Sequence, residues 1–298
     1  MLSILIPTYN YDVTQLVATV HKQLVELGII FEIIVFDDAS INKDTTAINQ
    51  TINKLKNSKF IILPDNIGRS KIRNLLAQKA IYKWLLFLDA DVKISNPNFI
   101  KIYLESIDAK TQVIYGGIEY QKEKPAKNQI LRWIYGNKRE SLSVKQREEN
   151  PYISFLTLNF LIKKDVFDSV HFNEDIPNLR HEDTLFALNL KEYNISITHI
   201  NNPIIHLGLE SSSIFLKKSE EAIDAILLFE KQKLINPSEV KITRVANKYK
   251  SFSTLFLVLF NFSKPLLKNN ILSNNPSLLL FDFYRLGYLF TIKSKTNA

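Results

Sequence analysis

The chain of 298 residues contains no cysteine, which excludes disulfide bonds and zinc sites built on thiolates. No stretch reaches the roughly 18 uninterrupted apolar residues that a membrane-spanning helix requires. The first residues carry neither a basic segment nor a cleavage site, so we expect no signal peptide. What remains is a globular composition, with 46% hydrophobic and 23% charged residues. The length suits one large domain, or one domain with a substantial appendage.

The net charge of +8 is concentrated in the last part of the chain. Residues 214–298 hold 13 Lys and Arg against 6 Asp and Glu. The same segment contains aromatic-aliphatic runs at 255–260 and 278–281, and this combination is typical of a surface that contacts anionic lipid. The alternative is a helical cap whose lysines are merely solvated, and both interpretations stay open. No recognition motif supports a nucleic-acid partner, so none is expected.

Short apolar segments alternate with amphipathic ones over the first hundred residues. The expected strands are 3–6, 32–36, 60–63 and 84–88. The expected helices are 13–27, 44–56 and 69–82. This alternation predicts an α/β fold with a mostly parallel central sheet, right-handed crossovers and helices on both faces.

The rest of the chain is less regular. We expect strands at 113–118, 156–162 and 195–205, with a loop or short helices at 121–150. From residue 213 onward the pattern is helical, and breaks are expected near Pro237, Pro265 and Pro276. The predicted domains are therefore 1–212, which carries the sheet, and a basic, helical C-terminal region at 213–298.

Polar residues follow the ends of the expected strands at 7–10, 37–40, 64–68 and 89–91. Because ligands of parallel sheets bind beyond the carboxyl ends of the strands, these segments should converge on one crevice. The most informative of them is Asp89-Ala90-Asp91. Two carboxylates one residue apart suit a hard cation such as Mg²⁺ or Mn²⁺, which also takes substrate phosphate as a ligand. Alone, such a pair is a weak signal.

Six motifs in a fixed order carry a more specific signal. They are Ser3–Asn10, Ile34–Ser40, Asn66–Asn74, Phe87–Asp91, His181–Asp183 and His206–Gly208. Together they resemble the family 2 glycosyltransferases of the GT-A fold, over residues 3 to about 210. The resemblance implies an inverting enzyme that moves a sugar from a nucleotide-diphospho-sugar, with a UDP-sugar preferred, to a hydroxyl of a glycan or lipid-linked acceptor. It also implies a divalent cation, Mn²⁺ or Mg²⁺.

The resemblance assigns the donor site to six residues, one of which, Asp89, is shared with the cation. Tyr9 would stack on the nucleotide base, Pro7 would bring the first strand close to it, and Asp38 would accept the N3–H of the base. Gly68 permits a tight turn at the start of a helix, whose N-terminus favours anions, and Arg73 would lie near the nucleotide. For Asp38 the alternative is a helix N-cap.

The resemblance assigns the cation to three residues. Asp91 would bind the cation that bridges the two phosphates. Asp89 would contact ribose or sugar hydroxyls, directly or through the metal, and is counted with both the donor site and the metal site. His206 would complete the metal shell, and the alternative for it is an ordinary histidine at a strand end.

The pair Glu182-Asp183 opens a predicted apolar helix. In the family the aspartate of this pair is the general base, so Asp183 would take the proton of the acceptor hydroxyl, with Glu182 as the other member of the catalytic pair. The alternative is a capping carboxylate at a helix start.

The sequence favours three other functions less than the transfer of one sugar. A nucleotidyltransferase usually has a lysine-rich glycine loop after the first strand, and 7–11 lacks it. A processive polymerase is disfavoured because no tryptophan follows Asp183. A nucleotide- or carbohydrate-binding module without activity is disfavoured because the acidic residues and His206 are all present. The expected location is the cytoplasm, with the inner face of the cell membrane as a peripheral site reached through 213–298.

Overall fold

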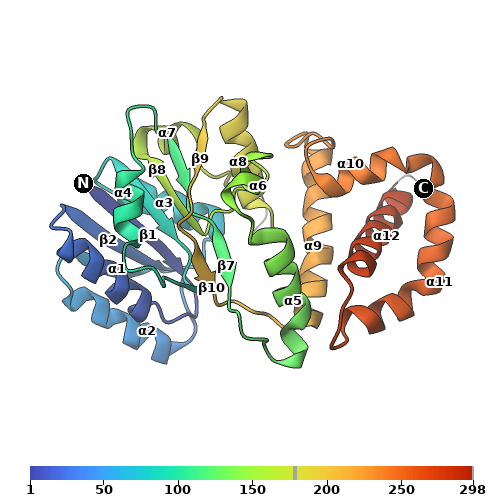
Figure 1. Ribbon diagram of the computed structural model, residues 1–298, viewed down its shortest axis with the longest axis horizontal. Helices are drawn as coiled ribbons and strands as arrows, with labels where there is room; N and C mark the ends of the chain where they lie inside the picture. Colours follow the sequence, from blue (N-terminus) through green and yellow to red (C-terminus); the bar gives the residue numbers. More distant parts are fainter. Residues whose placement is uncertain (177–179, 297–298) are drawn as a thin grey trace. The chain divides into compact units, whose positions relative to one another are not determined.

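A seven-stranded sheet forms the centre of the first of two units into which the chain divides (Figure 1). The structure is a computed structural model, and it describes residues 1–176 and 180–296. The first unit comprises Met1–Gln121, Glu140–Asn178 and Glu182–Gly208, and the second comprises Lys122–Arg139, Leu179–His181 and Leu209–Ala298. The second unit thus takes in 122–139 in addition to the C-terminal region expected as a domain.

The strands of the large sheet run in the order β3-β2-β1-β4-β8-β6-β9. Their bounds are β1 Leu2–Thr8, β2 Phe31–Asp37, β3 Ser58–Ile62, β4 Trp84–Leu88, β6 Val113–Tyr115, β8 Asn159–Lys163 and β9 Ile197–His199. All neighbouring pairs are parallel except those that β8 makes with β4 and β6. The prediction of a mostly parallel α/β sheet is confirmed.

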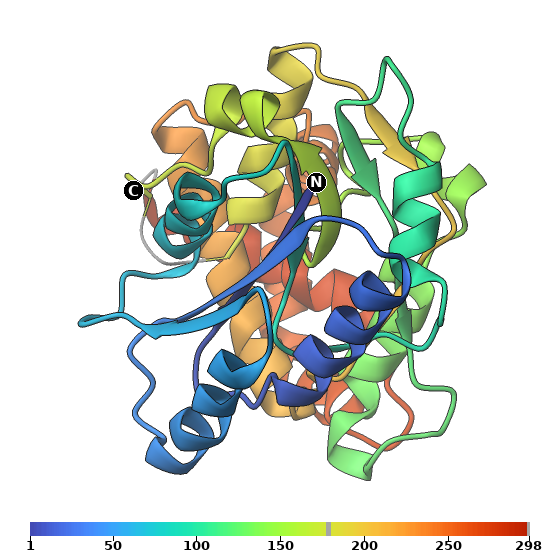
Figure 2. The ribbon, with the colours of Figure 1, turned by 90° about the vertical axis from the view of Figure 1, so that its left-hand side faces the viewer.

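Helices cover both faces of this sheet. Their bounds are α1 Thr14–Glu26, α2 Lys43–Asn49, α3 Arg69–Lys79, α4 Phe99–Glu105, α6 Val144–Glu148, α7 Lys164–Val170 and α8 Glu182–Glu192. Helix α1 packs with α4, while α3 packs with α7, and α7 with α8. Figure 2 shows α1 and α2, in blue, beside the N-terminal strands that they connect.

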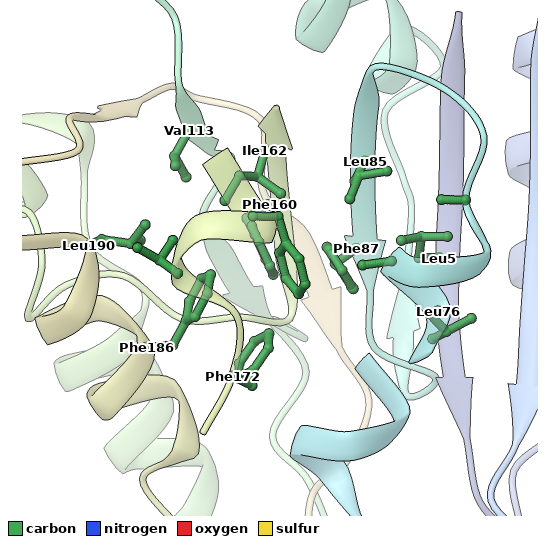
Figure 3. Packing of buried hydrophobic residues seen from close by; sticks show 14 of the residues in the cluster. Leu5, Leu76, Leu85, Phe87, Val113, Phe160, Ile162, Phe172, Phe186 and Leu190 are labelled. Atoms are coloured by element: carbon green, nitrogen blue, oxygen red, sulfur yellow. The ribbon is translucent and has the colours of Figure 1, made fainter. Parts of the chain in front are cut away.

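The core lies between the sheet and the group α3, α7 and α8 (Figure 3). Strand residues alternate between the two faces of a sheet, so Leu5 and Phe87 point to this side. Phe87 stacks on Phe160 of β8 at a centroid distance of 4.8 Å, and Phe172 stacks on Phe186 at 4.2 Å. These aromatic contacts tie the strands to α8 and fix the position of its first turn.

A second sheet of three strands, in the order β5-β10-β7, lies in the same unit. Its bounds are β5 Val92–Lys93, β7 Ile118–Tyr120 and β10 Ile204–His206. The strand expected at 113–118 is therefore wrong, because the segment is split between the two sheets, while the strand region expected at 195–205 contains one strand of each sheet. The split falls at Gly116-Gly117, where Gly117 has a φ of +99°, a conformation that side chains disfavour.

The second unit is helical, as expected for the C-terminal region. Its helices are α5 Ile130–Tyr135, α9 Ser212–Lys231, α10 Lys241–Lys248, α11 Ser253–Ile271 and α12 Leu278–Thr296. Phe215, Phe260, Phe281 and Tyr284 are buried in its own core. No helix among the described residues is long and apolar enough to cross a membrane.

Helix breaks occur where Pro237 and Pro276 predict them, but the break predicted at Pro265 is wrong. Pro265 lies inside α11, and the helix continues to Ile271. A proline removes the hydrogen bond to the carbonyl four residues earlier, which here belongs to Asn261. Asn261 and Pro265 are both exposed, so water can satisfy that carbonyl.

Candidate functional site

The loops that follow β1 and β2 are joined by hydrogen bonds at the carboxyl edge of the sheet. The backbone N–H of Asp38 donates to the carbonyl of Thr8 at 2.9 Å, and the N–H of Asn10 donates to Ser40 Oγ at 2.6 Å. Asn10 Oδ1 in turn accepts from the amides of Ile41 and Asn42. Two of the four segments expected to converge, 7–10 and 37–40, are thus in contact, and Asn10 and Ser40 supply the side-chain hydrogen bonds between them.

Asp38 binds the loop that precedes α3. Its two carboxylate oxygens accept hydrogen bonds from the amides of Ile67 at 2.7 Å and Gly68 at 3.0 Å. Gly68 has a φ of +83° and stands at the N-cap position of α3. Asp38 therefore shapes the turn before α3, a contact that the sequence did not indicate.

The neighbouring Asp37 was not predicted as a site residue. It is fully buried, and its Oδ1 accepts from the amide of Ser40 at 2.6 Å. Its Oδ2 has no hydrogen-bond partner among the described residues. The role of Asp37 in the structure is to hold the loop after β2.

Tyr9 and Pro7 lie at the end of β1. Pro7 is paired with Phe36 of β2 and is partly buried. Tyr9 follows the strand, and its side chain is 48% exposed to solvent.

Arg73 lies at the centre of a group of charged side chains. It is only 5% exposed, and its Nη2 donates to Asp89 Oδ1 at 2.7 Å. Its Nη1 lies 3.6 Å from Glu182 Oε1, and the same oxygen is 3.8 Å from Arg69 Nη1. The guanidinium also lies over the Phe172 ring, 5.5 Å from its centroid. Three elements, α3, the end of β4 and the start of α8, therefore meet at one cation.

Burial and neighbouring charges shift the pKa values in this group. Burial disfavours the Arg73 cation, but Asp89 and Glu182 outweigh that effect, and the pKa of Arg73 is raised. Burial raises the pKa of Asp89, with the negative charges of Asp91 and Glu182 adding to it and Arg73 opposing it. Arg73 thus keeps its charge and provides the counterion for Asp89.

Asp183 stands in the first turn of α8, beside Glu182. Its Oδ1 accepts from the amide of Thr184 at 2.7 Å. Burial raises the pKa of Asp183, and the Thr184 amide, Arg73 and Arg69 oppose that rise. The raised pKa makes this carboxylate a better proton acceptor than an exposed aspartate.

Asp91 and His206 are brought together by the small sheet. Val92 of β5 pairs with His206 of β10, and the amide of Leu207 donates to the carbonyl of Asp91 at 2.8 Å. As a result, His206 Nε2 lies 3.3 Å from Asp91 Oδ2. Gly208 leaves room for this pair, because a Cβ at that position would lie 2.1 Å from Asp91 Oδ2.

The fit of a divalent cation to these residues can be judged from the donor atoms. Within residues 1–176 and 180–296, no group of three or more His, Asp or Glu side chains gathers closely enough to hold a metal ion. Asp89 is turned to Arg73, so the structure pairs Asp91 with His206 and not with Asp89. One carboxylate and one imidazole suit a cation that takes its remaining ligands from phosphate and water. The residues therefore fit a cation bound together with a nucleotide, not an all-protein cage.

Three further residues lie in the site, although none was assigned to it from the sequence. Arg69 approaches Glu182, Phe172 lies against Arg73, and the Tyr120 ring packs edge-on to His206 with centroids 5.6 Å apart. Arg69 follows Gly68 inside a quoted motif, and a cation at the start of that helix suits an anionic ligand. Phe172 and Tyr120 stand outside the motifs, and only the fold reveals them.

Residues 3–172, more than half of the chain, match Glycosyl transferase family 2. The chain belongs to this family. An uncharacterized glycosyltransferase of Haemophilus influenzae is 26% identical to this family 2 enzyme over 238 residues, which are 78% of this chain and 90% of the relative.

Solved structures share the fold of this glycosyltransferase. A mannosyltransferase of Pyrobaculum calidifontis, solved with GDP-Man and Mn²⁺, has a TM-score of 0.56 at 11% identity, over 99% of this chain and 86% of its own. Residues 1–349 of TarS from S. aureus give a TM-score of 0.53 at 18% identity, over 99% and 91%. The chain spans 39% of the longer TarS structure. At these identities the comparison shows the fold, which is GT-A.

Proposed function

We propose that this family 2 glycosyltransferase transfers a sugar, with inversion, from a nucleotide-diphospho-sugar to a hydroxyl of a glycan or lipid-linked acceptor. The observation that carries the proposal is the Asp91–His206 pair, 3.3 Å apart at the end of the sheet where Asp38, Gly68 and Arg73 also lie. A UDP-sugar is the first donor to test.

The donor would lie along this edge of the sheet. Tyr9 offers an exposed ring for the base, and the carboxylate of Asp38 has lone pairs left for the N3–H of a uracil beside the two amides that it already binds. The solved relatives support the donor class: the mannosyltransferase of P. calidifontis holds GDP-Man with Mn²⁺, and a glucosyl-3-phosphoglycerate synthase of Mycobacterium tuberculosis holds UDP with Mg²⁺.

A cation at Asp91 and His206 would supply neutralisation of the charge that develops on the departing nucleoside diphosphate. The residues of the chain supply the rest. Arg73 holds Asp89 in place, so that its second oxygen can accept a sugar or ribose hydroxyl. Glu182 lies beside Arg73 and Arg69, and its negative charge offsets part of their positive charge.

Asp183 would act as the base. One of its oxygens accepts from Thr184, and the other would take the proton of the acceptor hydroxyl as that oxygen attacks the anomeric carbon. The leaving diphosphate needs no acid, so a single base suffices. Attack from the side opposite the leaving group inverts the anomeric configuration.

Calorimetric titration with UDP-, GDP-, CDP- and dTDP-sugars, in Mn²⁺ or in EDTA, tests the proposal. We expect one nucleotide to bind in Mn²⁺, with the affinity reduced in EDTA and in Asp91→Ala. The control is Asp165→Ala, which removes a carboxylate that is 65% exposed on α7. Failure of every sugar nucleotide to bind in Mn²⁺ would refute the proposed donor site.

A further inference from the structure

The outer side of α11 carries a stripe of exposed apolar side chains. They are Leu255 (61% exposed), Val258 (62%), Leu259 (54%), Phe262 (87%) and Leu266 (68%). We call these five residues the α11 face. Their spacing of three and four residues places them on one side of the helix. A contiguous apolar surface of this kind marks an interaction site more often than a free surface.

The opposite side of the same helix is packed and holds its cations. Phe260 and Leu267 are buried in the core of the second unit. Lys264 Nζ lies 5.6 Å from the centroid of the Phe260 ring, and Lys268 Nζ lies 5.8 Å from that of Tyr284. A helix that only covers a core points its apolar stripe inward and its lysines to water. In α11 both sides are apolar, and the more exposed one has no partner within the described part of the second unit.

The surroundings of the α11 face are basic. Between Glu239 and Asp282 the sequence contains six Lys and Arg and no acidic residue. Lys264 and Lys268 belong to the packed side of α11, and the other four cations precede the helix. Directly before the helix, Lys248, Tyr249, Lys250 and Phe252 are all exposed. This mixture of lysine and aromatic side chains is suited to the phosphate level of a membrane, where rings and amines lie at the boundary between water and lipid.

At the far end of the α11–α12 hairpin, exposed apolar and basic side chains again lie together. Leu279, at the start of α12, is 78% exposed. It lines a cavity of about 610 Å³ together with Lys138 and Arg139. Arg139 is paired with Asp282 at 2.7 Å, and Lys138 adds a second cation beside the cavity. Exposed apolar groups thus have cations beside them at both ends of α11.

We propose that the α11 face docks on a lipid surface that contains anionic lipid. The helix would lie in the plane of the interface, with the five apolar side chains among the acyl chains and the flanking lysines at the lipid phosphates. The proposal concerns the second unit and goes beyond the proposed transferase reaction.

A second copy of the chain suits this surface less well. A twofold interface brings the same patch of each copy together. The segment between Glu239 and Asp282 would then meet its own copy with cations on both sides and no carboxylate to pair with them. An anionic lipid surface supplies the missing negative charge.

Sedimentation of the full-length protein with vesicles tests the inference. The vesicles are phosphatidylcholine alone, or phosphatidylcholine with phosphatidylglycerol at a ratio of about 7:3. We expect binding to the mixed vesicles, and a loss of about tenfold or more in Phe262→Ser/Leu266→Ser, since two large apolar groups no longer enter the lipid. The matched control is Ile41→Ser/Ile81→Ser, which removes two exposed side chains of the first unit (76% and 72%) and should bind as wild type.

The lysines are tested in Lys248→Gln/Lys250→Gln. We expect binding to the mixed vesicles to weaken by about fivefold per lysine, with little change on phosphatidylcholine alone. The inference would be overturned if the wild-type protein did not bind the mixed vesicles. It would also be overturned if Phe262→Ser/Leu266→Ser bound them as well as wild type. A third contradicting result would be a wild-type dimer in sedimentation velocity that is absent in Phe262→Ser/Leu266→Ser, because the α11 face would then join two copies. Thermal unfolding of each variant confirms that it is folded.

Discussion

At the scale of single residues, Gly208 decides how much room Asp91 and His206 have. A Cβ at 208 would lie 2.1 Å from Asp91 Oδ2 and 3.1 Å from His206 Nε2. Asp91 or the chain at 208 must then shift, and the two donor atoms no longer hold their present arrangement.

We therefore expect Gly208→Ala to raise the Mn²⁺ concentration needed for half-maximal activity by about 10- to 100-fold, the range typical of disturbed metal surroundings. The measurement is a titration of the transfer rate with Mn²⁺. Gly28→Asn is the control, since position 28 has open space and a left-handed backbone that asparagine tolerates. If Gly208→Ala left the Mn²⁺ dependence of the rate unchanged, the cation would not be bound by Asp91 and His206.

Asp183 gives a prediction about pH. A base must be ionised to accept a proton, so activity is lost as pH falls through its folded pKa. Burial raises that pKa above 3.8, the ordinary aspartate value. The acidic limb of the rate profile should therefore lie above pH 3.8 by the amount of that shift.

Asp183→Asn should lower the rate by about 10²- to 10⁴-fold and leave donor affinity nearly unchanged. The checks are pH-rate profiles and donor titrations. Asp168→Asn, an exposed change on α7, serves as the control. If Asp183→Asn retains most of the activity, or keeps the wild-type acidic limb, another group is the base.

The sequence could predict which side chains gather but not how they pair. Asp89, Asp91 and His206 were identified from the order of the motifs. That Asp89 faces Arg73 while Asp91 faces His206 depends on where α3 and β10 lie beside the end of β4. Such distances are set by packing between elements far apart in the chain, and no local pattern encodes them.

At the scale of elements, α3, β4 and α8 are joined through Arg73. Removing this cation leaves Asp89 without its partner, and Glu182 with only the more exposed Arg69, 3.8 Å away, as a counterion. A broken buried pair typically costs about 3–5 kcal/mol, and the partial exposure of Asp89 reduces that figure. We expect Arg73→Ala to lower the free energy of unfolding by about 2–3 kcal/mol.

Denaturant unfolding measures this loss. Lys71→Ala lies on the exposed side of the same helix and should change stability by less than about 0.5 kcal/mol. If Arg73→Ala also changed the free energy of unfolding by less than about 0.5 kcal/mol, the charges would be well solvated. The charged group would then not hold the three elements together.

In the second unit, α11 and α12 approach closely at Gly287. A Cβ there would lie 2.2 Å from Phe260 Cδ2. Overpacking of this kind costs about 1–3 kcal/mol, so Gly287→Ala should lower the unfolding temperature even though alanine favours helices. Leu279→Ala, exposed on the same helix, is the matched control. Equal unfolding temperatures for the two variants would contradict the packing described for Phe260.

Elements with a clear period were predicted well, and those that depend on tertiary context were not. Strand β4 lies at 84–88 as predicted, because a continuous apolar run suits a strand buried on both faces. The segment 113–118 was expected to be one strand, but it crosses from one sheet to the other at Gly116-Gly117. The helix α11 continues past Pro265, because this residue lies on the exposed side of the helix. The sequence alone did not show which side of the helix Pro265 occupies.

At the scale of the whole molecule, the sequence predicted the GT-A fold and the family, and the comparisons confirm both. Six motifs in order are specific because they come from different elements: four lie at the ends of β1 to β4, one opens α8, and one ends β10 of the small sheet. The grouping of 122–139 with the C-terminal helices was not predictable. That segment has no long periodic pattern, and its place depends on contacts such as that of Leu131 with the core around Phe215.

The central claim is that Asp91 and His206 hold a divalent cation together with a nucleoside diphosphate. The most direct measurement is anomalous diffraction from crystals grown with Mn²⁺ and UDP. We predict a manganese peak at about 2.0–2.3 Å from both Asp91 Oδ2 and His206 Nε2, with diphosphate oxygens as its other ligands. A bound nucleotide whose manganese contacts neither residue would contradict it.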